Sequence, residues 1–122
     1  MSSHPERAQD YLEHMLLALE RIQHYTAGKS AEEFMASTLV QDGVLRNLGI
    51  LGEAAHRLLA EAPEFVATHP EISFARIYAT RNRITHAYEE VDLEIVWNLV
   101  VNDVPALQPA IAAVLNELNR KG

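Results

Sequence analysis

The stretch VLRNLGILGEAAHRL, residues 44–58, decides the fold class of this 122-residue chain. Its apolar residues recur every three or four positions, at Val44, Leu48, Leu51, Ala55 and Leu58. This spacing is that of one face of an α-helix, whereas a half-buried strand would alternate every second residue. Gly49 and Gly52 lie inside the same stretch, although each glycine costs roughly 1 kcal/mol relative to alanine in a helix interior. We interpret both glycines as points of close approach by another helix.

The helical period continues toward the N-terminus. Apolar residues again step by three and four, at Leu12, Met15, Leu16, Leu19 and Ile22. Gly28 is a plausible end for this helix, because glycine adopts the left-handed conformation that often follows a last turn. Ser30 and Glu33 have the spacing of a capping box, which predicts that a short helix begins there.

The C-terminal half also has a helical pattern. Pro63 should end the helix of residues 44–58, and Ser73 and Asp92 are candidate caps for the helices that follow them. The last apolar stripe contains Val96, Leu99, Val100, Leu107, Ile111, Val114 and Leu118. Pro105 and Pro109 fall inside this stripe, and we expect them to kink or break the helix. The sequence therefore predicts an all-α bundle of four main helices plus short connecting helices, in a single domain over residues 1–122.

Composition limits the function. The chain has no cysteine, so disulfides, zinc thiolates and thiol nucleophiles are excluded. Its polar N-terminus does not resemble a secretory signal, and its uninterrupted apolar runs are too short to span a bilayer. A soluble protein of the cytoplasm with no membrane partner is the expectation. The formal net charge of −7 is unfavourable for a broad nucleic-acid surface, so any polyanion would have to bind a local basic patch.

A polar cluster in RNRITHAYEEVD, residues 81–92, is the candidate site. Arg81 has a planar guanidinium suited to phosphate oxygens, Asn82 adds neutral donors, and His86 can exchange a proton near neutral pH. These groups suffice for RNA cleavage without a metal, because the RNA 2′-hydroxyl is itself the nucleophile. We predict no metal site, since the six histidines form no HExxH pair and no histidine is closely spaced with carboxylates as in a metal-binding motif.

The spacing within this cluster leaves two alternatives. On a regular helix, Arg81 and His86 are about 140° apart, so they converge only if the helix loosens or a second subunit completes the site. A twofold dimer would supply two histidines, one as base and one as acid. The competing interpretation is a solvated helix end, in which Arg81 and Arg83 pair with Glu89 and Glu90.

The motif resembles that of the HepT-like toxins, members of the HEPN group. RNRITHAY matches the family pattern of Arg, any four residues, His, any one residue, Tyr, with Arg81, His86 and Tyr88 in the motif positions. The similarity extends to residues 11–34, 44–58 and 88–107, while Phe74 replaces a frequent tryptophan.

This resemblance implies a homodimeric, metal-independent endoribonuclease that acts as a toxin in type II or VII toxin–antitoxin modules and needs no cofactor. Arg81 and His86 would be catalytic. The implied partner is an MntA-type nucleotidyltransferase, which transfers AMP from ATP to Tyr88 and so neutralises the toxin. The expected substrate is RNA, either tRNA or mRNA.

A helical dimer that binds a nucleotidyltransferase partner or a nucleotide, and cuts nothing, is the alternative. The net charge favours it. The RNase interpretation instead requires a concave basic surface, for which the candidate phosphate-binding residues are Arg46, Arg76, Asn82 and Arg83 beside Arg81.

Overall fold

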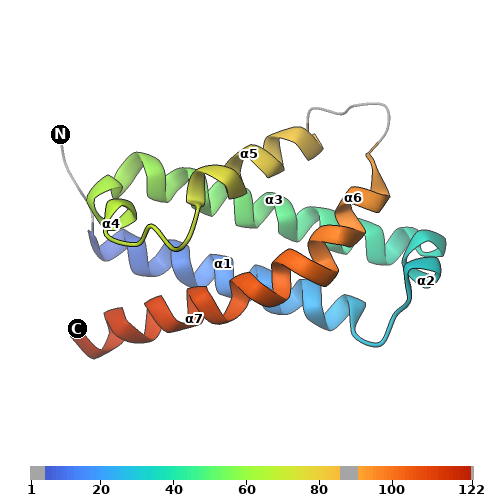
Figure 1. Ribbon diagram of the computed structural model, residues 1–122, viewed down its shortest axis with the longest axis horizontal. Helices are drawn as coiled ribbons and strands as arrows, with labels where there is room; N and C mark the ends of the chain where they lie inside the picture. Colours follow the sequence, from blue (N-terminus) through green and yellow to red (C-terminus); the bar gives the residue numbers. More distant parts are fainter. Residues whose placement is uncertain (1–4, 86–90, 122) are drawn as a thin grey trace.

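The computed structural model describes residues 5–85 and 91–121, and within these ranges the secondary structure is helical (Figure 1). The four longest helices are α1 (Pro5–Thr26), α3 (Thr38–Glu61), α5 (Phe74–Thr85) and α7 (Val104–Lys121). Short helices connect them: α2 (Ala31–Ala36), α4 (Pro63–Ala67), α6 (Leu93–Asn98) and the π-helical turn η1 (Leu99–Asp103). The all-α fold class, with four main helices and short connecting ones, is therefore confirmed.

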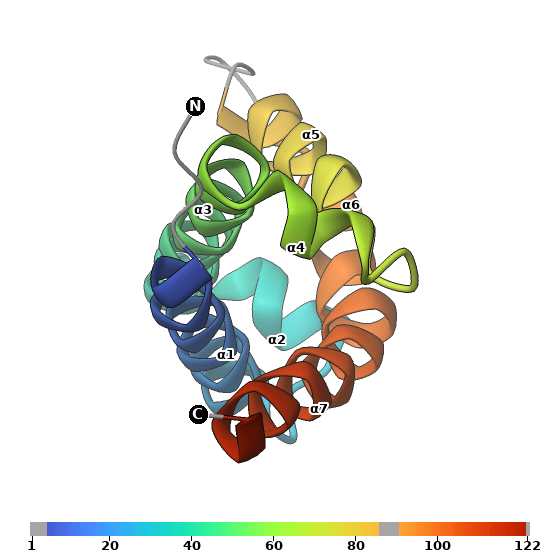
Figure 2. The same ribbon diagram turned by 90° about the vertical axis from the view of Figure 1, so that its left-hand side faces the viewer.

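Helices α1 and α3 pack against each other along one side of the bundle. Figure 2 shows the order α7, α1, α3, α5 around the bundle, with α1 packed against both α7 and α3. Helix α5 packs on α3 and makes few contacts with the other described elements. The core lies mainly between α1, α3 and α7, and its largest fully buried side chains include Leu12, Met15, Leu19, Phe34, Leu58 and Ile111. The predicted apolar stripe of α3 is buried throughout.

Three predicted helix boundaries have the expected chemistry. Gly28 adopts a φ of 72° after α1. The capping box is present, because the Ser30 hydroxyl accepts from the Glu33 N–H at 3.1 Å and the Glu33 carboxylate accepts from the Ser30 N–H at 2.9 Å. Asp92 caps α6 by accepting from the N–H groups of Glu94 and Ile95. Local polar groups therefore fix where these helices start and stop.

The two prolines do not break the last helix, which was one of the two effects expected of them. Pro105 and Pro109 both lie within α7, and the helical path is continuous from α6 through η1 into α7. The irregularity lies just upstream, where the Val104 N–H donates to the Leu99 carbonyl five residues before it. A π turn widens the helix, which gives room for the Pro105 ring near the preceding carbonyls. The chain thus accommodates the prolines without a break.

One polar residue of α3 is buried. Asn47 is 3% exposed, and its Nδ2 donates to the Gly43 carbonyl at 2.8 Å. Its side chain thus bonds to the backbone of its own helix four residues back, which allows the amide nitrogen to be buried.

The segment Leu93–Arg120 is long and apolar enough to cross a membrane by length and composition alone, which its short apolar runs did not suggest. Its apolar face is nevertheless part of the core, with Val96, Val100, Val104 and Ile111 buried. Packing inside the bundle accounts for part of its apolar character, since 28% of its most apolar window is buried.

A charged cluster ties the start of α1 to the end of α3. Glu61 accepts from Arg7 Nη1 at 2.9 Å and from the Tyr11 hydroxyl at 2.9 Å. The hydrogen bond from Arg7, followed by that from Tyr11, lowers the pKa of the Glu61 carboxyl. Because the folded pKa lies below the unfolded one, this stabilisation is present above the ordinary glutamate pKa and is lost as pH falls through the folded value.

We therefore expect Glu61→Gln to melt at a lower temperature than the wild type at pH 7, because the amide carries no charge for Arg7. The difference should shrink as the pH falls below the ordinary glutamate pKa and vanish below the folded pKa, where the glutamate is protonated in both states. Thermal melts followed by circular dichroism at pH 7 and pH 3 check this. An equal difference at both pH values would show that the charge of Glu61 is not the cause.

Candidate active site

The structure places the first half of the predicted motif. Arg81, Asn82 and Arg83 lie toward the end of α5, with Arg81 and Asn82 half-buried and Arg83 exposed. His86 and Tyr88 fall outside the described residues. The described geometry therefore concerns the guanidinium side of the candidate site and its surroundings on α3.

Arg81 lies against Gly52 of α3. A Cβ atom on Gly52 would overlap Cβ and Cγ of Arg81, so the arginine stem occupies the space that any side chain at position 52 would need. The predicted close approach is thus confirmed at Gly52. It was wrong at Gly49, where an added Cβ would meet nothing within 4 Å. The two glycines are three residues apart and face different surroundings.

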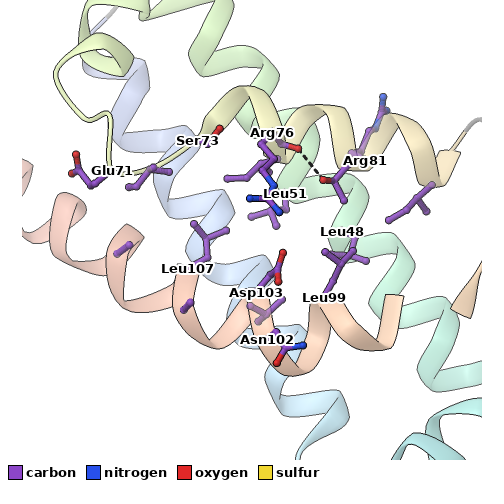
Figure 3. Close-up of a pocket in the computed structure, with 17 residues that line it drawn as sticks. Leu48, Leu51, Glu71, Ser73, Arg76, Arg81, Leu99, Asn102, Asp103 and Leu107 are labelled. Carbon is purple, nitrogen blue, oxygen red and sulfur yellow. Dashed lines mark hydrogen bonds between the residues drawn. The ribbon is translucent and has the colours of Figure 1, made fainter. Parts of the chain in front are cut away.

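The guanidinium of Arg81 is directed by its neighbours. Its Nε is buried, and its Nη1 donates to Oδ1 of Asn82 at 3.1 Å. Figure 3 shows the end of the Arg81 side chain pointing away from the neighbouring cavity, whereas Arg76 reaches from α5 toward that cavity. Two arginines from one helix therefore leave it in different directions.

The cavity measures about 390 Å³ and lies between α3, α5, η1 and α7 (Figure 3). Apolar side chains form most of its wall, among them Leu48, Leu51, Ile77, Ile84, Leu99 and Leu107. Its polar lining includes Ser73, Thr80 and Asn102. Thr80 donates to the Arg76 carbonyl at 2.9 Å, so its hydroxyl is engaged with the backbone of its own helix.

The charges around this cavity are balanced. Arg76 and Arg81 contribute two positive groups, and Glu71 and Asp103 contribute two carboxylates. Among the candidate phosphate-binding residues, Arg76 lines this cavity together with Arg81. The cavity lining does not include Arg46, Asn82 or Arg83. This cavity is therefore not the concave basic surface that the RNase interpretation requires, and the phosphate-binding roles of these residues stay a prediction. The exposed Arg83 and the half-buried Asn82 remain neighbours of Arg81 along α5.

A stacked aromatic pair beside Arg81 was missed by the sequence analysis. The rings of His56 and Tyr78 lie 4.5 Å apart with an interplanar angle of 23°. His56 is one helical turn beyond Gly52, and Tyr78 is one turn before Arg81. The pair therefore bridges α3 and α5 next to the Gly52–Arg81 contact. Had the Gly52–Arg81 contact been known, the one-turn spacing on each helix would have predicted that His56 and Tyr78 lie close together.

Metal binding finds no support in the described part of the chain. No group of three or more histidine, aspartate or glutamate side chains there is arranged to hold a metal ion.

Comparison with known proteins gives the class. Residues 15–114 match the family model described as "Ribonuclease HepT-like". "Probable ribonuclease HepT" of Thermococcus cleftensis is 34% identical over 99 residues, covering 81% of this chain and 87% of the relative. "Putative RNase TTE0752" of Caldanaerobacter subterraneus is 28% identical over 107 residues, covering 88% of this chain and 93% of the relative.

A larger relative contains the same region. "Gamma-glutamylcyclotransferase and putative RNase MJ0434" of Methanocaldococcus jannaschii is 34% identical over 110 residues, which cover 90% of this chain. The chain spans about half of that protein, with 48% of its length aligned. No solved structure matches the chain.

An all-helical fold and an arginine-centred site thus coincide with a family match over most of the sequence. The chain belongs to the HepT-like ribonuclease family. The predicted family is therefore confirmed, and with it the expected enzyme class, that of the ribonucleases.

Proposed function

We propose that the chain is the toxin of a toxin–antitoxin pair, a metal-independent endoribonuclease of the cytoplasm that cleaves RNA with Arg81 and His86. Family membership carries this proposal. The setting of Arg81 supports it, because a guanidinium whose stem is packed against Gly52 is held in place before a phosphate arrives. Asn82 and Arg83 beside it would bind flanking phosphates.

The chemistry needs two proton transfers. The RNA 2′-oxygen attacks the adjacent phosphorus and loses its proton to a base, forming a 2′–P bond. The bond from phosphorus to the 5′-oxygen then breaks, and that oxygen takes a proton from an acid. Charge accumulates on the phosphoryl oxygens between the two steps, and Arg81 would stabilise it. His86 would move the protons.

A homodimer would complete this site. One imidazole cannot easily act on opposite sides of the same phosphorus, whereas a twofold axis would supply a second His86 from the partner subunit. The partner of the whole toxin would be an MntA-type nucleotidyltransferase. Transfer of AMP to Tyr88 would place a bulky anion in the site and exclude RNA by volume and by charge.

RNA cleavage in the presence of excess EDTA tests the proposed activity. Purified wild-type protein should cut RNA at an unchanged rate in EDTA, because the nucleophile and the proton carriers need no metal. His86→Ala should lose at least about 100-fold in rate, the contribution expected of general acid–base catalysis. Cleavage that stops in EDTA would contradict the metal-independent mechanism, and a fully active His86→Ala would remove His86 from it.

The second candidate function is a non-catalytic dimer that binds a nucleotidyltransferase or a nucleotide. The net charge of −7 and the balanced charges of the cavity favour it.

Light scattering, ATP-binding calorimetry and AMP transfer by a co-purified nucleotidyltransferase distinguish the two candidate functions. Dimers that bind ATP or accept AMP, with no RNA cleavage by unmodified protein, would support the binding module. Tyr88→Phe should prevent the AMP transfer in either case.

A further inference from the structure

We propose that Gly52 is a positioning residue for Arg81, and that its missing side chain sets the place at which the Arg81 guanidinium meets the substrate. This inference rests on the proposed function, because it assumes that Arg81 acts on the scissile phosphate. It extends that proposal to a residue on another helix, twenty-nine positions earlier in the chain.

The first observation is which atoms are in contact. A Cβ on Gly52 would overlap Cβ and Cγ of Arg81 and would come within 3.3 Å of its Cδ. Cβ and Cγ are the part of the side chain nearest the backbone, so a rotamer change at the far end of Arg81 cannot relieve the overlap. Any residue larger than glycine at position 52 would therefore have to push α5 away from α3 at the level of Arg81.

The second observation is that the neighbouring turn restricts how α5 can respond. His56 and Tyr78 stack at 4.5 Å between the same two helices, one turn away from the Gly52–Arg81 contact. A displacement of α5 at Arg81 must either separate these rings or tilt the helix about them. In both cases the guanidinium moves relative to α3.

The third observation concerns the other end of the side chain. Arg81 Nη1 is bonded to Asn82 Oδ1, and Figure 3 shows the group directed away from the cavity. The stem is thus fixed by α3 and the tip by Asn82, so that the guanidinium has a defined direction. A displacement of about 1 Å at a reacting group can cost on the order of 100-fold in rate.

The chain supplies a matched control for this role. Gly49 is in the interior of the same helix, three residues earlier, and an added Cβ there would meet nothing within 4 Å. Alanine at either position gains the same intrinsic helix propensity. A difference between Gly52→Ala and Gly49→Ala therefore reports the contact with Arg81 and not the general effect of replacing a glycine.

The experiment compares wild type, Gly52→Ala and Gly49→Ala on one RNA that the wild type cleaves. We expect Gly52→Ala to lower kcat about 100-fold with KM within about threefold, because the transition state depends on placement more than ground-state binding does. Gly49→Ala should keep kcat within about twofold and melt at an equal or higher temperature. The Nε–H resonance of Arg81 should shift in Gly52→Ala and stay in place in Gly49→Ala. A folded Gly52→Ala with wild-type kcat and an unmoved Arg81 resonance would overturn the proposal.

A double substitution covers the case in which Gly52→Ala does not fold. Arg81→Gly removes the stem that an alanine at 52 would meet, so Gly52→Ala combined with Arg81→Gly should be at least as stable as Arg81→Gly alone. Equal destabilisation by Gly52→Ala with and without Arg81→Gly would show that the two residues are not coupled, and would overturn the proposal. If the wild type cuts no RNA, the proposed function fails, while the Arg81 resonance and this cycle still test the positioning by Gly52.

Discussion

Replacing Arg81 by methionine is expected to lower the rate of RNA cleavage by about 100- to 1000-fold, the usual effect of removing one donor that stabilises transition-state charge. Methionine keeps the Cβ and Cγ atoms that pack on Gly52, so the α3–α5 contact should persist. It removes the fork of N–H groups that would hold the phosphoryl oxygens. Single-turnover cleavage of a labelled RNA measures the change.

The control for this prediction separates the site from overall charge. Arg21 is exposed on α1, and Arg21→Met removes the same single positive charge. It should leave the cleavage rate within about twofold, because α1 makes few contacts with α5, which carries Arg81, and salt screens charges beyond about 8–10 Å. Equal losses in Arg21→Met and Arg81→Met would mean that the net charge, and not the placement of Arg81, determines activity. In a cell, Arg81→Met should also relieve toxicity.

Replacing Phe34 by alanine is expected to reduce the free energy of unfolding by about 3–5 kcal/mol. Phe34 is the fully buried residue of the short helix α2, and its ring lies 5.2 Å from that of Trp97 in α6. Its removal would leave a void between two short helices that have few other buried side chains. Because small domains are stable by only about 5–15 kcal/mol, this loss would be a large share of the total. Urea unfolding measures it.

Leu39 provides the comparison for Phe34, since it is 84% exposed on the first turn of α3. Leu39→Ala removes apolar atoms that are already in water, so its effect should stay within about 0.5 kcal/mol. Phe34→Leu, which keeps an apolar group in the space, should fall between the two alanine variants. If Phe34→Ala unfolds at the same urea concentration as Leu39→Ala, the α2–α6 contact does not stabilise the fold.

The helices were predictable because their signals are local. The apolar stripe of α3, the capping box at Ser30 and the cap at Asp92 each depend on residues within one or two turns. The π turn at Leu99–Asp103 was not predictable in this way. A proline predicts strain in a helix, but whether the chain kinks or widens depends on how the helix is packed against its neighbours.

The site was only partly predictable, because its contacts depend on how α5 packs against α3 and not on local sequence. Arg81 and Asn82 stand out in the sequence, but Gly49 and Gly52 have the same local context, and only the position of α5 tells them apart. His56 and Tyr78 are twenty-two residues apart and carry no motif, so their stacking is a property of the α3–α5 packing. The grouping of Arg76 with Glu71 and Asp103 likewise follows from the packing around η1.

Helix α5 is attached to the bundle chiefly through α3, while α1, α3 and α7 form the main body. Helix α5, which carries Arg81, could therefore separate from α3 by local unfolding while the other helices stay folded. A thermal melt would report mainly the unfolding of α1, α3 and α7, so a variant in which α5 has separated from α3 would still give an ordinary melting curve. An inactive variant with a normal melting temperature has therefore either lost a catalytic group or displaced α5. Only a spectroscopic probe on α5 itself distinguishes these two causes.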